Sequence, residues 1–102
     1  MKPYSGFISS SRQGTIYIPW NKLVKLIGPP HCVGDMDKSD GQWDFILPGK
    51  SFISIWNYKN GPNYDREIKS VAKIKEFSVY WSGDAGRKKL KKLFGDNFVS
   101  EK

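Results

Sequence analysis

The chain has 102 residues, a formal net charge of +7, one cysteine and fifteen aromatic side chains (four Trp, five Tyr and six Phe). This length is typical of one domain, and so many large aromatic residues supply enough apolar surface for a core, which argues against a disordered chain. The single cysteine excludes an internal disulfide, and one histidine with one cysteine excludes a structural zinc site and a pair of catalytic histidines.

The first predicted elements are a strand and a helix. Residues 14–18 combine β-branched and aromatic side chains, which favours a strand. Pro19 can open a helix, and apolar residues then recur at three- and four-residue spacing through Ile27. The Gly-Pro-Pro sequence at 28–30 ends this helix, and the polar stretch 31–41 is expected to be a loop.

A β-hairpin is predicted next. Residues 43–47 alternate in character, Pro48-Gly49 is a turn signal, and residues 51–58 form the second strand. Both faces of residues 51–58 are apolar, so we expect a central strand that is covered on both sides.

The last third of the chain contains a strand and a helix. Residues 60–65 are expected to form a loop, and residues 68–74 remain open between helix and strand because helical spacing runs into a strand pattern. Residues 77–81 form the strand, residues 82–84 break it, and a helix follows to about Phe94. Only residues 100–102 have the character of a free tail.

These elements predict an α+β fold, with a small antiparallel β-sheet and two helices in the approximate order β-α-β-β-β-α. We expect a single domain over residues 1–102 with an ordered core at about 14–96. No apolar run is long enough to cross a bilayer, and the N-terminal residues lack the hydrophobic stretch of a signal peptide. We therefore expect a cytoplasmic protein with no membrane partner.

The start of the last predicted helix is the clearest candidate for an anion site. The first N–H groups of a helix have no internal partners, and the helix dipole adds partial positive charge there. Glycines let a ligand approach the backbone, and two basic residues lie within one turn. Alternatively, Ser82 or Asp84 caps the helix and the lysines are solvated. The predicted phosphate seat consists of Ser82, Gly83, Gly86, Arg87 and Lys88.

The same helix has a basic face around its apolar seam. Five basic residues within six positions can follow a nucleic-acid backbone, and binding through them would fall steeply with salt. Cations near the C-terminal end of a helix also stabilise it without any partner. The basic face consists of Arg87, Lys88, Lys89, Lys91 and Lys92.

Two tyrosines are candidates for stacking a nucleobase, although most aromatic residues of the sheet are expected to be core. Tyr58 ends a strand, and Tyr80 faces away from the apolar side of its strand. Lys59 places a cation beside Tyr58, a combination suited to a nucleotide.

The sequence favours no catalytic or metal site. His31 and Cys32 are adjacent in a loop, where two side chains rarely point at each other. The carboxylates of Asp35, Asp37 and Asp40 lack the pattern of an EF-hand calcium loop. We therefore expect no enzyme activity, cofactor or metal, and an acidic loop that is solvated or paired with the basic helix.

The chain contains six short motifs in this order: Trp20-x-x-Leu23, Gly28-x-Pro30, Trp43-x-Phe45, Ile55-x-Asn57-Tyr58-Lys59, Val79-x-Trp81-x-Gly83 and Leu90-x-x-Leu93. Together these motifs resemble small accessory domains encoded by tailed bacteriophages. The resemblance covers about residues 15 to 94 and implies a counter-defence protein in the bacterial host cytoplasm. Such proteins include sponges, which sequester nucleotide second messengers, and anti-CRISPR proteins, which block an effector directly.

Two functions follow as hypotheses. The first is a phage counter-defence protein that binds and sequesters a small phosphorylated nucleotide signal without catalysis. We expect it to be a homo-oligomer, because a domain this small has little room for a deep pocket of its own. The alternative is a basic protein that binds nucleic acid or blocks a host defence protein. A protein-protein inhibitor with an apolar surface patch is a third possibility.

Overall fold

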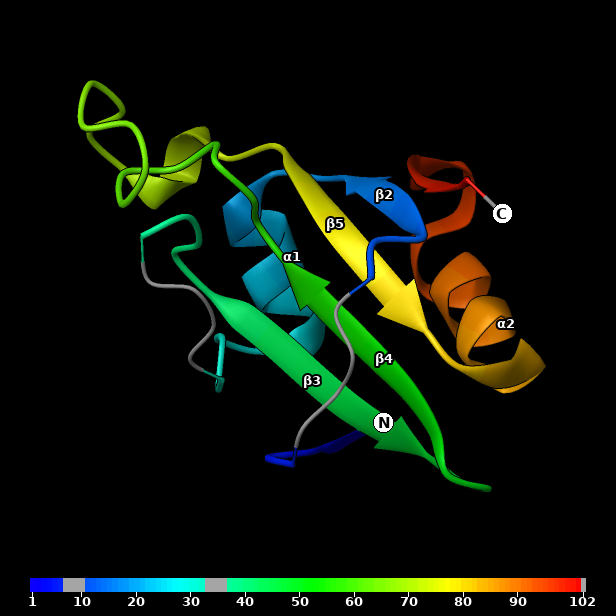
Figure 1. Ribbon diagram of the computed structural model, residues 1–102. Coiled ribbons are helices and arrows are strands. Elements are labelled where there is room, and N and C mark those ends of the chain that lie inside the picture. Colours follow the sequence, from blue (N-terminus) through cyan, green and yellow to red (C-terminus); the bar gives the residue numbers. More distant parts are fainter. Residues whose placement is uncertain (7–10, 33–36, 102) are drawn as a thin grey trace.

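A six-stranded antiparallel sheet is covered on one face by two α-helices in the computed structural model, which describes residues 1–6, 11–32 and 37–101 (Figure 1). The strands are β1 (Lys2–Pro3), β2 (Gly14–Tyr17), β3 (Gln42–Leu47), β4 (Ser51–Trp56), β5 (Glu76–Trp81) and β6 (Phe98–Ser100). The helices are α1 (Trp20–Ile27) and α2 (Gly83–Phe94), with short 3-10 turns η1 (Val71–Lys73) and η2 (Gly95–Asn97).

The α+β class, the antiparallel sheet and the two helices are confirmed, but the predicted element order is incomplete. The strands lie in the order β1-β3-β4-β5-β2-β6, so β1 and β6 are edge strands that the sequence analysis missed. Each has only two or three residues, which is too short to show the two-residue periodicity of a strand. Backbone pairing joins β1 to β3 and β6 to β2.

The prediction of a free tail at residues 100–102 is wrong for Ser100 and Glu101. Ser100 belongs to β6 and pairs with Gly14. Glu101 donates its backbone N–H to the Gln13 carbonyl at 2.9 Å, and its carboxylate lies 3.0 Å from the Arg12 guanidinium. Lys102 and Asp35, which the sequence analysis also considered, lie outside the described residues.

The hairpin of β3 and β4 forms as predicted, although the second strand is shorter. It ends at Trp56, before the predicted boundary at residue 58. β4 pairs with both β3 and β5, which confirms its central position. Ile53 is fully buried beneath the helices, and Ser54 is fully buried on the other face, so both sides of β4 are covered.

Residues 68–74, for which the sequence favoured neither helix nor strand, contain the single 3-10 turn η1. The Ser70 hydroxyl accepts a hydrogen bond from the Ala72 N–H at 3.1 Å, which caps this turn. Ile74 then enters the core, and its carbonyl accepts a hydrogen bond from the Trp20 N–H at 2.9 Å. This hydrogen bond connects the segment that contains η1 to the start of α1.

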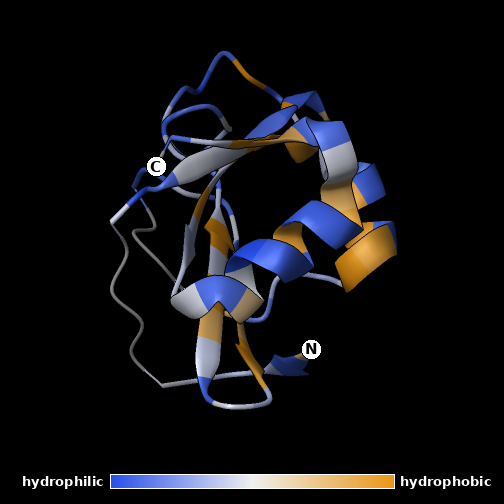
Figure 2. Ribbon diagram, turned by 90° about the vertical axis from the view of Figure 1, so that its right-hand side faces the viewer, coloured by the Kyte–Doolittle hydropathy of each residue, from blue (hydrophilic) through white to orange (hydrophobic). Residues whose placement is uncertain are grey.

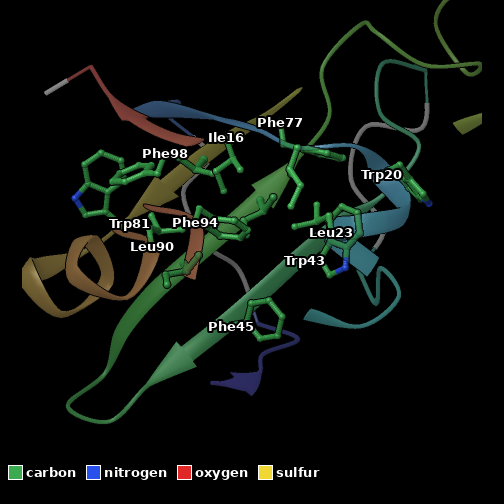
Figure 3. Close-up of a cluster of buried hydrophobic side chains, with 14 of the residues drawn as sticks. Ile16, Trp20, Leu23, Trp43, Phe45, Phe77, Trp81, Leu90, Phe94 and Phe98 are labelled. Atoms are coloured by element: carbon green, nitrogen blue, oxygen red, sulfur yellow. The ribbon is translucent and has the colours of Figure 1, made fainter. Parts of the chain in front are cut away.

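The hydrophobic core lies between the sheet and the two helices (Figure 3). Under α1, Trp20 packs edge-on against Trp43, with ring centroids 5.3 Å apart. Near α2, Trp81 packs edge-on against Phe98 of β6 at 5.4 Å. Because Leu90 is also fully buried, α2 is fixed by its apolar side and presents its polar side to solvent.

Neither helix has the length of a membrane span. α1 has 8 residues and α2 has 12, whereas about 20 apolar residues are needed to cross a bilayer. No other helix of the described ranges qualifies.

Candidate functional site

The start of α2 is bonded to the sheet. Gly83 has a φ of +73°, a conformation that favours glycine, and it turns the chain from β5 into the helix. Ser82 donates its N–H to the Phe52 carbonyl at 3.0 Å, and its hydroxyl accepts the Phe52 N–H at 2.8 Å. Ser82 therefore makes no capping hydrogen bond to the helix.

Gly86 serves the packing of α2 on the sheet. It is buried, and a Cβ added there would lie 3.0 Å from the Trp81 Cβ and 3.1 Å from the Phe52 carbonyl oxygen. The close approach that this glycine permits is therefore between α2 and β4, and not between the helix and a ligand.

The basic side chains of α2 form what we call the helix surface. Four of them are exposed and Lys89 is half-buried. Lys91 lies 3.6 Å from the exposed Asp96 carboxylate, and the other four have no ion pair within the described part of the chain. Figure 2 looks onto this side of the molecule, where α2 is mostly hydrophilic. The helix surface consists of Arg87, Lys88, Lys89, Lys91 and Lys92.

Two open hollows flank the helix surface, one on each side of Lys88. The first has a volume of about 430 Å³ and the second about 530 Å³. The first is lined by Arg87, Lys88, Lys91, Phe98 and Ser100. The second is lined by Met1, Leu47, Pro48, Ala85, Lys88, Lys89 and Lys92. Lysines border both hollows, so the positive charge extends across the full width of α2.

Tyr58 and Lys59 do not join this surface within one chain. Ser82 is bonded to Phe52 at one end of β4, whereas Tyr58 follows the other end (Figure 1). The six residue steps from 52 to 58 span about 20 Å at the usual rise of a strand. The predicted phosphate seat and the predicted aromatic–cation pair are therefore separate places.

Tyr80 lies at a third place. It pairs with Ser54 and sits on the sheet face opposite the two helices, where it is half-buried. The structure therefore brings together the basic residues of α2, and it brings together Tyr58 and Lys59. Tyr80 joins neither group.

Tyr17 and Tyr64 were missed by the sequence analysis. The Lys59 ammonium lies 5.3 Å from the ring centroids of both Tyr58 and Tyr64, in cation–π range. Tyr17 ends β2 at the same end of the sheet. The sequence contained a signal for Tyr64, because it is an aromatic residue in a polar loop, where it cannot be core.

His31 and Cys32 do not form a nucleophile–base pair. The His31 Nε2 lies 2.6 Å from the Asp44 carbonyl oxygen, and the Cys32 thiol donates to the Tyr4 carbonyl at 3.6 Å. Burial, and then the negative charge of Asp44, raise the pKa of the Cys32 thiol. A raised pKa disfavours the reactive thiolate.

Asp40 does not pair with the basic helix. Its carboxylate accepts hydrogen bonds from the Asn57 side chain at 2.9 Å and from the Asn63 N–H at 3.0 Å. No cluster of three or more metal-binding side chains occurs in the described ranges.

The fold and these surfaces define, at the level of class, an α+β domain with a basic helix on one side and exposed tyrosines at one end of its sheet. The chain matches no protein-family model, no curated protein and no solved structure.

Proposed function

We propose that this chain is a non-catalytic binding protein whose helix surface holds the phosphate backbone of a nucleic acid. The observation that carries the proposal is the arrangement of five basic side chains on both flanks of α2, beside two open hollows. Lys88 borders both hollows, so one strand of phosphates can contact either side of the helix.

The separation of the predicted sites favours an extended ligand over a small one. A mononucleotide on the helix surface does not reach Tyr58, about 20 Å along β4. A nucleic-acid strand has phosphates at regular intervals and suits a row of lysines without an enclosed pocket.

A small phosphorylated nucleotide is the second candidate. The hollow of about 430 Å³ beside Arg87, Lys88 and Lys91 has the size of a small-molecule site. In this form of the proposal the chain is a phage counter-defence protein that sequesters a nucleotide signal in the bacterial host cytoplasm. A homo-oligomer would enclose this open hollow with a second subunit.

Two measurements test these candidates together. Native mass spectrometry of protein purified from bacteria reports the oligomeric state and any retained purine-absorbing ligand. Fluorescence anisotropy with a labelled 12-nucleotide strand, repeated from 50 to 300 mM salt, reports nucleic-acid binding. Five phosphate contacts predict a slope of about −3 to −4 in log affinity against log salt.

The outcomes separate the candidates. Steep salt-dependent binding of the strand supports the nucleic-acid function. A stoichiometric retained nucleotide, with no strand binding, supports the second candidate and rejects the first. Binding that is indifferent to salt contradicts a role for the lysines.

A further inference from the structure

Three half-exposed tyrosines gather at one end of the sheet, which we call the tyrosine end. Tyr17, Tyr58 and Tyr64 are each 50% exposed, and in the described ranges they are the only exposed aromatic residues. They come from the end of β2, the segment after β4 and the following loop. A chain with fifteen aromatic residues thus buries most of them and leaves these three in one region.

Adjoining hollows connect Tyr58 with Tyr17. Tyr58 lines a hollow of about 110 Å³ with Arg12 and Ser78, and Tyr17 lines a second one of about 270 Å³ with Lys73. Glu76 pairs with Tyr17 in the sheet and lines both hollows. The two rings therefore flank one shallow surface, which is lined by the basic residues Arg12, Lys73 and Lys75 and by the acidic Glu76.

Lys59 is held over two of the rings by its backbone. Its φ of +56° is unusual for a residue with a side chain and has an energetic cost. The Lys59 N–H donates to the Lys38 carbonyl at 2.8 Å, which fixes this conformation. The ammonium then lies 5.3 Å from the ring centroids of Tyr58 and Tyr64.

A buried polar network fixes the surrounding loops. Asn57 is fully buried, and its amide oxygen accepts the N–H groups of Asp40 at 2.8 Å and Gly41 at 3.2 Å. Asn63 donates its side-chain N–H to the Ser39 carbonyl at 2.9 Å, next to Tyr64. The tyrosine end is therefore organised before any ligand arrives, which lowers the entropy cost of binding.

We propose that the tyrosine end stacks unpaired nucleobases, so that the protein binds single-stranded nucleic acid through bases here and through phosphates at the helix surface. Exposed aromatic rings with nearby cations are the usual platform for unpaired bases, because every base has a π-face. Bases inside a duplex are already stacked on one another and do not reach such rings. The inference rests on the proposed nucleic-acid function of α2.

The test compares two labelled 12-nucleotide probes that carry the same phosphates. One is an intact thymidine strand, and the other has abasic sites in place of its central six bases. Anisotropy titrations use the wild type, the double variant Tyr17→Ala/Tyr58→Ala, and Tyr17→Phe/Tyr58→Phe as the matched control that keeps both rings. Thermal melting verifies that each variant is folded.

We expect the wild type to bind the intact strand about five-fold to one hundred-fold more tightly than the abasic strand. The alanine variant should lose this preference, and the phenylalanine variant should keep it. If the wild type binds both probes equally with steep salt dependence, the stacking inference is overturned while the function of α2 stands. If neither probe binds at 50 mM salt, the proposed function itself fails.

Discussion

The side chain of Asn57 donates a hydrogen bond to the Asp40 carboxylate at 2.9 Å, and the Asp40 N–H returns one to the Asn57 amide oxygen at 2.8 Å. This reciprocal pair joins the loop before β3 to the segment after β4. It uses the acidic residue that the sequence analysis assigned to a solvated loop. The pair positions Tyr58 and Lys59, which follow Asn57 directly.

Asn57→Ala should lower the free energy of unfolding by about 2 to 4 kcal/mol, because the N–H groups of Asp40 and Gly41 lose their acceptor. Urea denaturation measures the loss. The matched control is Asn97→Ala, at an exposed position in η2, where we expect a change within about 0.5 kcal/mol. Equal effects at the two positions would contradict the role of the network.

Gly86→Ala should destabilise the fold by about 1 to 3 kcal/mol, because the new Cβ crowds Trp81 and the Phe52 carbonyl. Gly49→Ala is the control, since no atom lies within 4 Å of its Cβ and its cost comes only from a φ of +83°. Thermal denaturation compares them. A stable Gly86→Ala variant that loses ligand affinity would restore this glycine to a ligand site.

Phe98→Ala should cost about 3 to 5 kcal/mol, because Phe98 is buried and packs edge-on against Trp81. The neighbouring Val99 is 45% exposed, so Val99→Ala should cost less than about 1 kcal/mol. Urea denaturation of both variants tests whether β6 is part of the core. Two equally small effects would mean that the chain beyond α2 is dispensable.

Cys32 should react slowly with iodoacetamide at pH 7.5, because burial and the Asp44 charge raise the pKa of its thiol. Asp44→Asn removes the charge and should accelerate alkylation, while the amide oxygen still accepts from Ser54. Mass spectrometry follows the reaction, and protein unfolded in urea gives the unprotected rate. Equal rates in the native and unfolded protein would contradict the shift.

The raised pKa of the Cys32 thiol also makes the free energy of unfolding depend on pH. The folded thiol keeps its proton at pH values where the unfolded thiol, with a pKa near 9.0, loses it. The contribution of this group to the free energy of unfolding is therefore complete below pH 9 and declines as the pH rises above it.

The parts of the fold that the sequence predicted are those with a periodic pattern of several residues. The helix spacing of Leu23 and the alternation through Phe45 identified core-facing elements correctly. The edge strands β1 and β6 could not be predicted this way, because their pairing depends on backbone groups of distant strands.

The sequence predicted which elements carry the candidate residues, but it did not predict which of these residues lie together. The basic residues of α2 are neighbours because one helix carries them. Tyr58 follows the end of β4, and α2 follows the end of β5. Because these two neighbouring strands are antiparallel, their ends lie at opposite ends of the sheet. Tyr17 and Tyr64 lie at the same end of the sheet as Tyr58 because of the tertiary structure. A local sequence pattern cannot predict this arrangement.

The measurement that tests the central claim most directly compares two double variants with equal loss of charge. Lys88→Ala/Lys92→Ala removes two cations from the helix surface, and Lys22→Ala/Lys25→Ala removes two exposed cations from α1. Anisotropy with the 12-nucleotide strand is recorded for each over the same salt series. We predict that the α2 variant binds more weakly and that its salt slope falls by about one to two, while the α1 variant keeps the wild-type slope. Identical slopes for the two variants would contradict a nucleic-acid interface on α2, because affinity would then follow net charge alone.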